Sequence, residues 1–248
     1  MGINETFMSA CQVLFGQPIG ELAEFAPYLR EMVDQPAQAA SNLSGKKVYL
    51  SRPYSKEAKF IDVAEATGKP STLSINDIKD IDSVLSALPE KLSYCGNKNL
   101  GTSVGVVESD MCNDSFDVIS SQNVISSKHV AYSNGVRQSE GVFGCQLGGE
   151  VQFSMHSQVF FFSRRCFDAY LCFHSSDVYC SFNCRNCQEA MFSFNQSSKR
   201  HMIGNLEISK EKYLPLKRKL AEEIAGVLKT KKSFPSVFDI LKKGAING

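Results

Sequence analysis

The 248-residue sequence lacks the signatures of several large protein classes. No run of 18 apolar residues occurs, so we expect nothing to span a membrane. The N-terminus shows no basic start followed by an apolar core and a cleavage site, so we expect no secretory signal. A P-loop, a Gly-x-Ser-x-Gly elbow and a His-Glu-x-x-His pattern are also missing, and no catalytic residues are expected from them. These absences favour a location in the cytoplasm or in a virion.

Nine cysteines are many for this length, and five of them crowd one stretch. Their odd number, without a secretory signal, indicates reduced thiols rather than a disulfide framework. The spacing Cys180-x3-Cys184-x2-Cys187, with Cys172 nearby, is the best metal candidate, because zinc takes four tetrahedral Cys or His ligands. The alternative, which the sequence favours, is that these thiols stack inside successive repeats. Zinc is therefore the one cofactor that the sequence leaves open.

The net charge of +1 hides an uneven distribution. Residues 199–248 carry twelve Lys or Arg against five acidic residues, whereas the rest of the chain carries fifteen against twenty-one. A basic segment of this kind can bind an acidic partner such as nucleic acid, or dock on the acidic body of its own chain. The candidate contact residues are Lys217, Arg218, Lys219, Lys229, Lys231 and Lys232. Because aromatic residues are not interleaved with them, a solvated helix face is the favoured interpretation.

A six-residue repeat without a gap runs through residues 94–145. One column of the repeat is apolar and consists of Tyr94, Leu100, Val106, Cys112, Val118, Val124, Val130, Val136 and Val142. The other column is small and consists of Ser103, Ser109, Ser115, Ser121, Ser127, Ser133, Ser139 and Cys145. The residue before each apolar position is mostly a turn former such as Asn, Asp or Gly.

Fixed short periods of this kind are typical of solenoids, in which like residues of successive coils lie above one another. Valine prefers strands, so the Val column suits stacked β-strands. Positions three apart cannot share one face of an unbent strand, so we expect a bend between the Val and Ser columns. After Cys145 the pattern predicts a looser register, with an insertion at Gly148 and Gly149 and aromatic residues filling a wider coil. Coils of about 20 residues, roughly five in number, would result.

The fold expected is mainly β: a parallel β-solenoid with an N-terminal helical region and C-terminal capping helices. Three parts follow, namely residues 1–92, mostly helical, residues 93–206, the solenoid, and residues 207–248, a helical cap with the basic tail. In the first part, residues 18–33 and 74–92 show helical periodicity, and residues 47–51 are a strand candidate. In the last part, residues 209–229 form an amphipathic helix, and residues 235–243 suggest a short final one.

The stretch FNCRNCQEAMFSFNQSSKRHMIGNLEISKEKY resembles a family of cysteine-rich β-solenoid proteins from candidate-phyla bacteria and phages. The positions that match the pattern at the end of that family's coils are Asn195, Lys199, Asn205, Ser209-Lys210-Glu211 and Tyr213. The likeness covers residues 95–228 in style and about 183–213 in detail. This chain departs from the family in lacking a zinc-ribbon-like N-terminus and in having Ser or Val at most ladder positions of residues 100–145. The resemblance implies the fold, with a right-handed coil, and implies no activity.

Function is predicted less sharply than fold. The favoured interpretation is a non-catalytic structural or scaffolding solenoid that binds protein partners, or its own copies, through its ends and C-terminal helices, for example in a virion. A hexapeptide-type acyltransferase is an alternative, with His129 as the candidate base, but its aliphatic and small residues lie four apart, whereas here they lie three apart. A nucleic-acid or zinc-dependent binding module is the other alternative.

Overall fold

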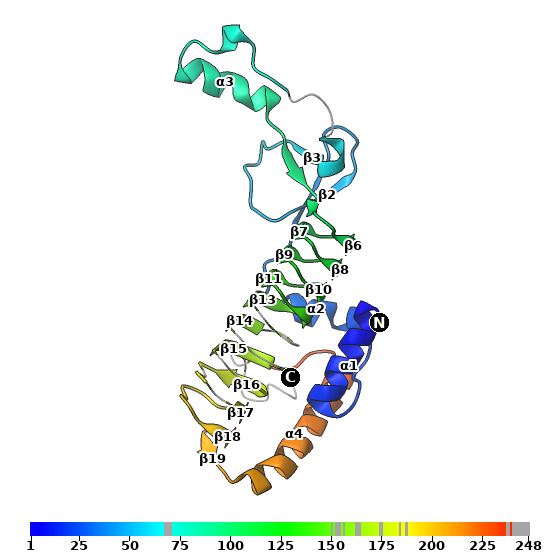
Figure 1. Cartoon of the computed structure of the whole chain (residues 1–248), viewed down its shortest axis with the longest axis vertical. Coiled ribbons are helices and arrows are strands. Elements are labelled where there is room, and N and C mark those ends of the chain that lie inside the picture. Colours follow the sequence, from blue (N-terminus) through cyan, green and yellow to red (C-terminus); the bar gives the residue numbers. More distant parts are fainter. Residues whose placement is uncertain are drawn as a thin grey trace.

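The structure is a computed structural model that describes residues 1–66, 71–149, 151, 155, 157–161, 165–173, 176–183, 185–186, 188–236 and 239. It has the shape of a long rod made by a parallel β-solenoid (Figure 1). Helices lie along one flank of the rod, and a helical arm extends from the end at which the solenoid begins (Figure 1). The predicted fold class is confirmed.

The solenoid strands are short and stack in two sheets. One sheet has the order β12-β10-β8-β6, and the other runs from β5 through β7, β9, β11 and β13 to β19. The strands of this part of the chain are β4 (Tyr94–Gly96), β5 (Asn99–Leu100), β6 (Val104–Val107), β7 (Asp110–Asn113), β8 (Phe116–Ile119), β9 (Gln122–Ile125), β10 (Lys128–Ala131), β11 (Asn134–Arg137), β12 (Glu140–Phe143), β13 (Cys145–Gly149), β14 (Ser157–Phe161), β15 (Phe167–Phe173), β16 (Val178–Phe182), β17 (Gln188–Met191), β18 (Arg200–Ile203) and β19 (Leu206–Glu207).

One coil consists of two hexads, which gives twelve residues per coil. Val118 of β8 pairs in parallel with Val106 of β6 and with Val130 of β10, each twelve positions away. The hexads in between form the opposite sheet, where Val124 pairs with Val136. The predicted coil of about 20 residues is wrong, so the coil is smaller and the stack taller than expected.

The register does not loosen after Cys145. Gly148 pairs with Phe160, and farther along Val178 pairs with Ala190, which pairs with Met202, always twelve positions apart. The predicted insertion at Gly148 and Gly149 is therefore wrong, because both glycines occupy ordinary ladder positions.

Left-handed backbone conformations recur at every third residue through much of the ladder. Asp117, Ser120, Asn123 and Ser126 have φ angles of 51°, 44°, 54° and 50°. Such angles are uncommon outside glycine, and Asn and Asp adopt them most readily, which explains the turn-forming column before each valine. Since Ser120 bends the chain between Val118 and the next serine of the Ser column, both columns point inward. The expected bend is confirmed.

The interior of the solenoid holds both columns. From Cys112 onward the apolar column is buried and continues beyond residue 145, with Cys112, Val118, Val124, Val130, Val136, Val142, Cys166, Val178, Ala190 and Met202 as members. Its first members, Tyr94 and Leu100, are 37% and 41% exposed. The serines join successive coils: the Ser121 hydroxyl donates to the Ile119 carbonyl (2.8 Å) and accepts from the Ser133 amide (3.0 Å). Ser181 and Ser193 repeat this contact twelve residues apart, at 3.1 Å.

A second core lies between the solenoid flank and the helices. α1 (Ile3–Phe15), η1 (Leu22–Phe25), α2 (Ala26–Arg30) and α4 (Lys210–Lys231) cover this flank. Every second hexad sends one side chain toward them, forming the column Ile119, Ala131, Phe143, Met155, Phe167, Tyr179, Met191 and Ile203. The Phe7 and Phe143 rings meet edge to face at 5.2 Å, and the Tyr179 hydroxyl donates to the Leu14 carbonyl at 2.7 Å. The aromatic residues Phe167 and Tyr179 thus fill this interface rather than a wider coil.

The helices begin and end where local chemistry requires. α1 starts after Gly2, whose amide donates to the Glu5 carboxylate (3.0 Å), and ends at Gly16 with φ 74°. The helix predicted over residues 18–33 is divided, because Pro27 occupies the first turn of α2. α4 confirms the predicted helix, and it runs along the flank, packing against α1 and β18 (Figure 1). The final helix predicted at residues 235–243 lies mostly outside the described residues.

The segment between α2 and the solenoid contains one strand that the sequence predicted and others that it did not. β2 (Lys47–Leu50) confirms the strand candidate at residues 47–51 and forms an antiparallel hairpin with β1 (Ala37–Ala40). β3 (Phe60–Asp62) pairs in parallel with β4, and the two form a separate two-stranded sheet. η2 (Val63–Glu65) follows, and the arm consists of η3 (Ile75–Asp77) and α3 (Ile81–Lys91). In the part of the chain that is described, no helix is long and apolar enough to cross a membrane.

Candidate functional site

The predicted zinc ligands are only partly described. Cys180 is buried, and burial together with nearby Asp168 raises the pKa of its thiol well above the ordinary 9.0, so the thiol stays protonated. Cys172 belongs to β15, whereas Cys184 and Cys187 lie outside the described residues. Among the residues that the structure describes, no group of three His, Cys, Asp or Glu side chains is placed to hold a metal. The zinc site stays a prediction.

Among the described residues, two of the six basic candidates form ion pairs with carboxylates outside α4. The Lys217 ammonium contacts the Asp177 carboxylate and lies 3.5 Å from Glu189. Lys232 lies 3.0 Å from the Glu24 carboxylate and above the Phe25 ring. These two lysines therefore fasten α4 to the solenoid and to the N-terminal helices.

The other basic candidates lie on the outer face of α4. The Lys219 side chain is 73% exposed and lies 3.9 Å from Glu223, and Arg218 and Lys231 are exposed as well. Lys229 donates to the Gln17 side chain at 2.6 Å. The structure thus spreads the six residues over different surroundings rather than gathering them in one basic patch.

A polar cluster occupies the solenoid corner beneath the start of α4. Arg165, Asp177, Glu189 and His201 follow one another at twelve-residue intervals, so they lie on successive coils at the same corner. Glu189 bridges the cluster, because one carboxylate oxygen lies 3.0 Å from His201 Nε2 and the other lies 3.5 Å from the Lys217 ammonium. Sequence reasoning missed this cluster, since only the true coil length brings these residues together.

Tyr213 packs behind the polar cluster. Its ring lies 5.3 Å from that of His201, and burial raises the pKa of its hydroxyl above the ordinary 10.0. The hydroxyl is buried, and among the described residues it has no hydrogen-bond partner. The cluster is thus closed on its inner side by α4 and open to solvent on its outer side.

His129, the candidate base of the acyltransferase alternative, occupies a corner of the solenoid. It has φ 52°, like other members of the turn column, and its side chain is only 13% exposed. Its Nδ1 lies 3.1 Å from the Asp117 carboxylate on the preceding coil. This pair repeats the acid–histidine stacking of Glu189 and His201.

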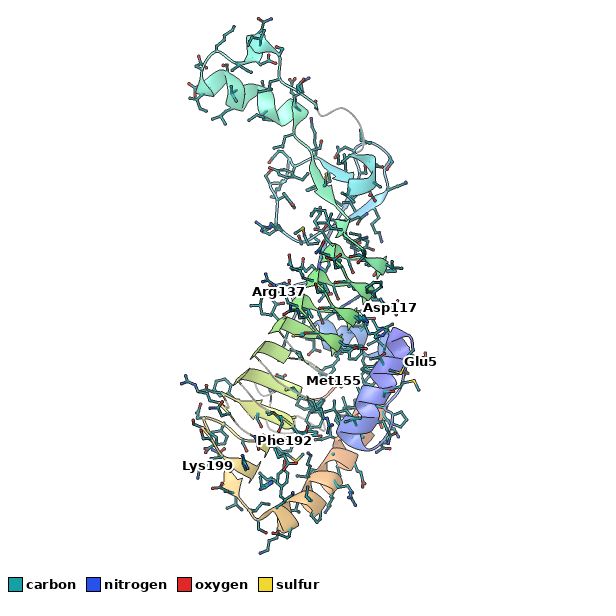
Figure 2. The ribbon with its side chains drawn as sticks, viewed as in Figure 1. Glu5, Asp117, Arg137, Met155, Phe192 and Lys199 are labelled. Atoms are coloured by element: carbon teal, nitrogen blue, oxygen red, sulfur yellow. The ribbon has the colours of Figure 1, made fainter. Side chains whose placement is uncertain are left out.

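The arm presents an apolar stripe to solvent. Ile75 and Ile78 belong to η3 and its C-terminal end, and Ile81 and Leu85 lie one helical turn apart on α3. These four side chains are between 54% and 81% exposed, and no residue of α3 is buried. Figure 2 shows the arm standing clear of the rod, with its side chains directed into solvent.

Comparison with known proteins gives no relative: no family model matches the chain, and neither a curated protein nor a solved structure is similar to it. The resemblance to cysteine-rich β-solenoid proteins therefore stays a prediction. Function has to be argued from the arm, the rod and the polar cluster.

Proposed function

We propose that this protein is a non-catalytic scaffold: a rigid β-solenoid that holds a helical arm away from its body and binds a partner protein through it. The carrying observation is the uncovered apolar stripe of the arm, at Ile75, Ile78, Ile81 and Leu85. A contiguous exposed apolar surface of this kind marks an interaction site more often than a solvated face. The rod supplies the rigidity, and the arm supplies the contact.

The partner that fits best is a protein with an apolar groove. α3 has eleven residues, or about three turns, and helices of this length are marginal on their own. Two such arms packed side by side would bury little surface, whereas a groove surrounds the stripe and buries all four side chains. Asp77, Asp80 and Asp82 flank the start of α3, so a groove with a basic rim complements the arm.

Assembly into a larger particle, such as a virion, is consistent with this role. The two ends of the rod differ: the arm extends from one, and α4 with the hairpin β18–β19 closes the other (Figure 1). A rod with unlike ends can join different components at a fixed distance. This placement in an assembly is part of the proposal.

The test is affinity capture from the native source with the double variant Ile81→Ser/Leu85→Ser. Each residue that enters an apolar groove contributes roughly 1.5–3 kcal/mol, so the double variant should lose at least about 100-fold in affinity for the captured protein. Because neither side chain has a packing role in the fold, the thermal unfolding of the variant should match that of the wild type.

Leu43→Ser is the matched control, since Leu43 is 70% exposed but lies in the β1–β2 turn. It should retain the captured protein. Light scattering of the purified chain decides the alternative: a dimer that the double variant dissolves would replace the groove partner with a second copy. Equal capture by both variants and the wild type would refute the proposed docking role of the arm.

A further inference from the structure

A cavity of about 560 Å³ opens over the polar cluster at the C-terminal end of the solenoid. Its walls come from the corner column Arg165, Asp177, Glu189 and His201, from Arg200 and its neighbours on adjacent coils, and from Lys210 at the start of α4. A volume of this size is ordinary for a small-molecule site. Every one of these side chains is polar, so the cavity suits a polar ligand.

The two carboxylates in the wall already have partners in the protein. Asp177 contacts the Lys217 ammonium, and Glu189 lies between Lys217 and His201. The side chains of Asp177 and Glu189 are only 17% and 25% exposed. Both residues line the cavity, and Lys217 offsets the repulsion between these two acids, which are stacked one coil apart.

Three cations in the wall have no such partner. Arg165, Arg200 and Lys210 are exposed, and among the described residues none of them forms an ion pair. They come from three separate elements: the corner before β15, strand β18 and the first residue of α4. With Lys217 behind them, the cavity wall has four cations against two carboxylates, and Glu211, whose charge interacts with His201 and Lys210, reduces the local positive excess to one. Convergence of unpaired cations from separate elements on one cavity indicates an anion as ligand.

We infer that this cavity binds a small phosphate-bearing molecule. Guanidinium groups present paired N–H donors that match phosphate oxygens, and two arginines with a lysine suit a group of more than one negative charge. The start of α4 adds the positive end of a 22-residue helix. Ser176 and Gln188 provide neutral hydrogen-bonding groups for the remainder of the ligand.

Isothermal titration of the full chain with pyrophosphate at low ionic strength tests the inference. Pyrophosphate should bind, and Arg200→Gln should weaken its binding by about 10- to 100-fold, since one charge-assisted contact is lost. Inorganic phosphate should compete more weakly. Because Arg200 is exposed, its variant should unfold at the wild-type temperature.

Lys219→Gln is the control, because it also removes one positive charge, from an exposed position on α4 outside the cavity. It should leave pyrophosphate affinity within about twofold. Equal weakening by Lys219→Gln and Arg200→Gln would replace the cavity with a diffuse charge effect. Absence of binding at millimolar pyrophosphate, or Arg200-dependent binding of single-stranded DNA with which pyrophosphate does not compete, would overturn the inference.

Discussion

Replacing Ser121 with alanine should show how much the hydrogen bonds of the Ser column contribute to the free energy of unfolding. The Ser121 hydroxyl donates to the Ile119 carbonyl and accepts from the Ser133 amide, at 2.8 and 3.0 Å. The carbonyl keeps a second donor, the Tyr132 amide at 3.0 Å, but the Ser133 amide is buried and would be left without an acceptor. An unpaired buried amide costs about 1–3 kcal/mol.

The loss of unfolding free energy is measurable by urea unfolding and by thermal unfolding, both followed by far-ultraviolet circular dichroism. For a chain of this size, about 2 kcal/mol corresponds to a decrease in Tm of roughly 4–8 °C. The control is Ser126→Ala, in a neighbouring column: Ser126 has φ 50°, close to the 44–54° of its neighbours, but its side chain is exposed. It should change the unfolding free energy by less than about 0.5 kcal/mol.

Ser121→Cys separates hydrogen bonding from size. Cys145 occupies the same column and is fully buried, so the column accepts a thiol sterically. A thiol is a weaker acceptor than a hydroxyl, and the variant should therefore fall between wild type and Ser121→Ala. If Ser121→Ala is as stable as Ser126→Ala, the hydroxyl relay does not hold successive coils together, and the reasoning is refuted.

Two further predictions concern ionisable groups. Burial raises the pKa values of the Cys112 and Cys145 thiols to about 12. Iodoacetamide at pH 8 should therefore leave both cysteines unlabelled in the native chain, whereas it should modify the partly exposed Cys95. Peptide mass mapping identifies the labelled cysteines. Early labelling of Cys112 would contradict its place in the core. The Ser120 hydroxyl donates to the Glu108 carboxylate and lowers its pKa below the ordinary 4.5. The ionised Glu108 therefore stabilises the folded state above pH 4.5, and this stabilisation is lost as the pH falls through the pKa of Glu108 in the folded state. The difference in Tm between wild type and Glu108→Gln should therefore shrink in acid, and a difference independent of pH would rule out this linkage.

The stacked fold was predictable because two columns repeat every six residues, and the structure places both inside the coil. The coil length was not predictable, because every hexad has the same Val and Ser positions and nothing in these columns distinguishes one hexad from the next. The residue after each valine carries the missing signal. Ala131 and Phe143, twelve apart, are buried against the helices, and Arg137 between them is exposed. The signal is weak, because Ile125, which precedes Ala131 by six residues, is apolar like Ile119.

The two functional regions were harder to predict, for different reasons. Helical periodicity over residues 74–92 predicted a helix, which the structure divides into η3 and α3. A sequence pattern does not reveal whether another part of the chain covers the apolar face of such a helix. The same limitation applies to α4, where helical spacing puts Leu216 on one stripe with Tyr213 and Leu220, but Leu216 is 44% exposed. The cavity that we propose binds phosphate is lined by side chains twelve residues apart in the sequence. The predicted coil of about 20 residues does not bring these side chains together.

Engineered disulfides test the twelve-residue coil most directly. Lys128 and Glu140 are exposed partners on neighbouring strands β10 and β12, and neighbouring strands lie about 4.8 Å apart, within reach of a disulfide. The pair Lys128→Cys/Glu140→Cys should cross-link under mild oxidation, as identified by peptide mass mapping, whereas Lys128→Cys/Asn134→Cys, on opposite sheets, should not. Cross-linking of the second pair, or of neither, would contradict the coil on which this description of the rod depends.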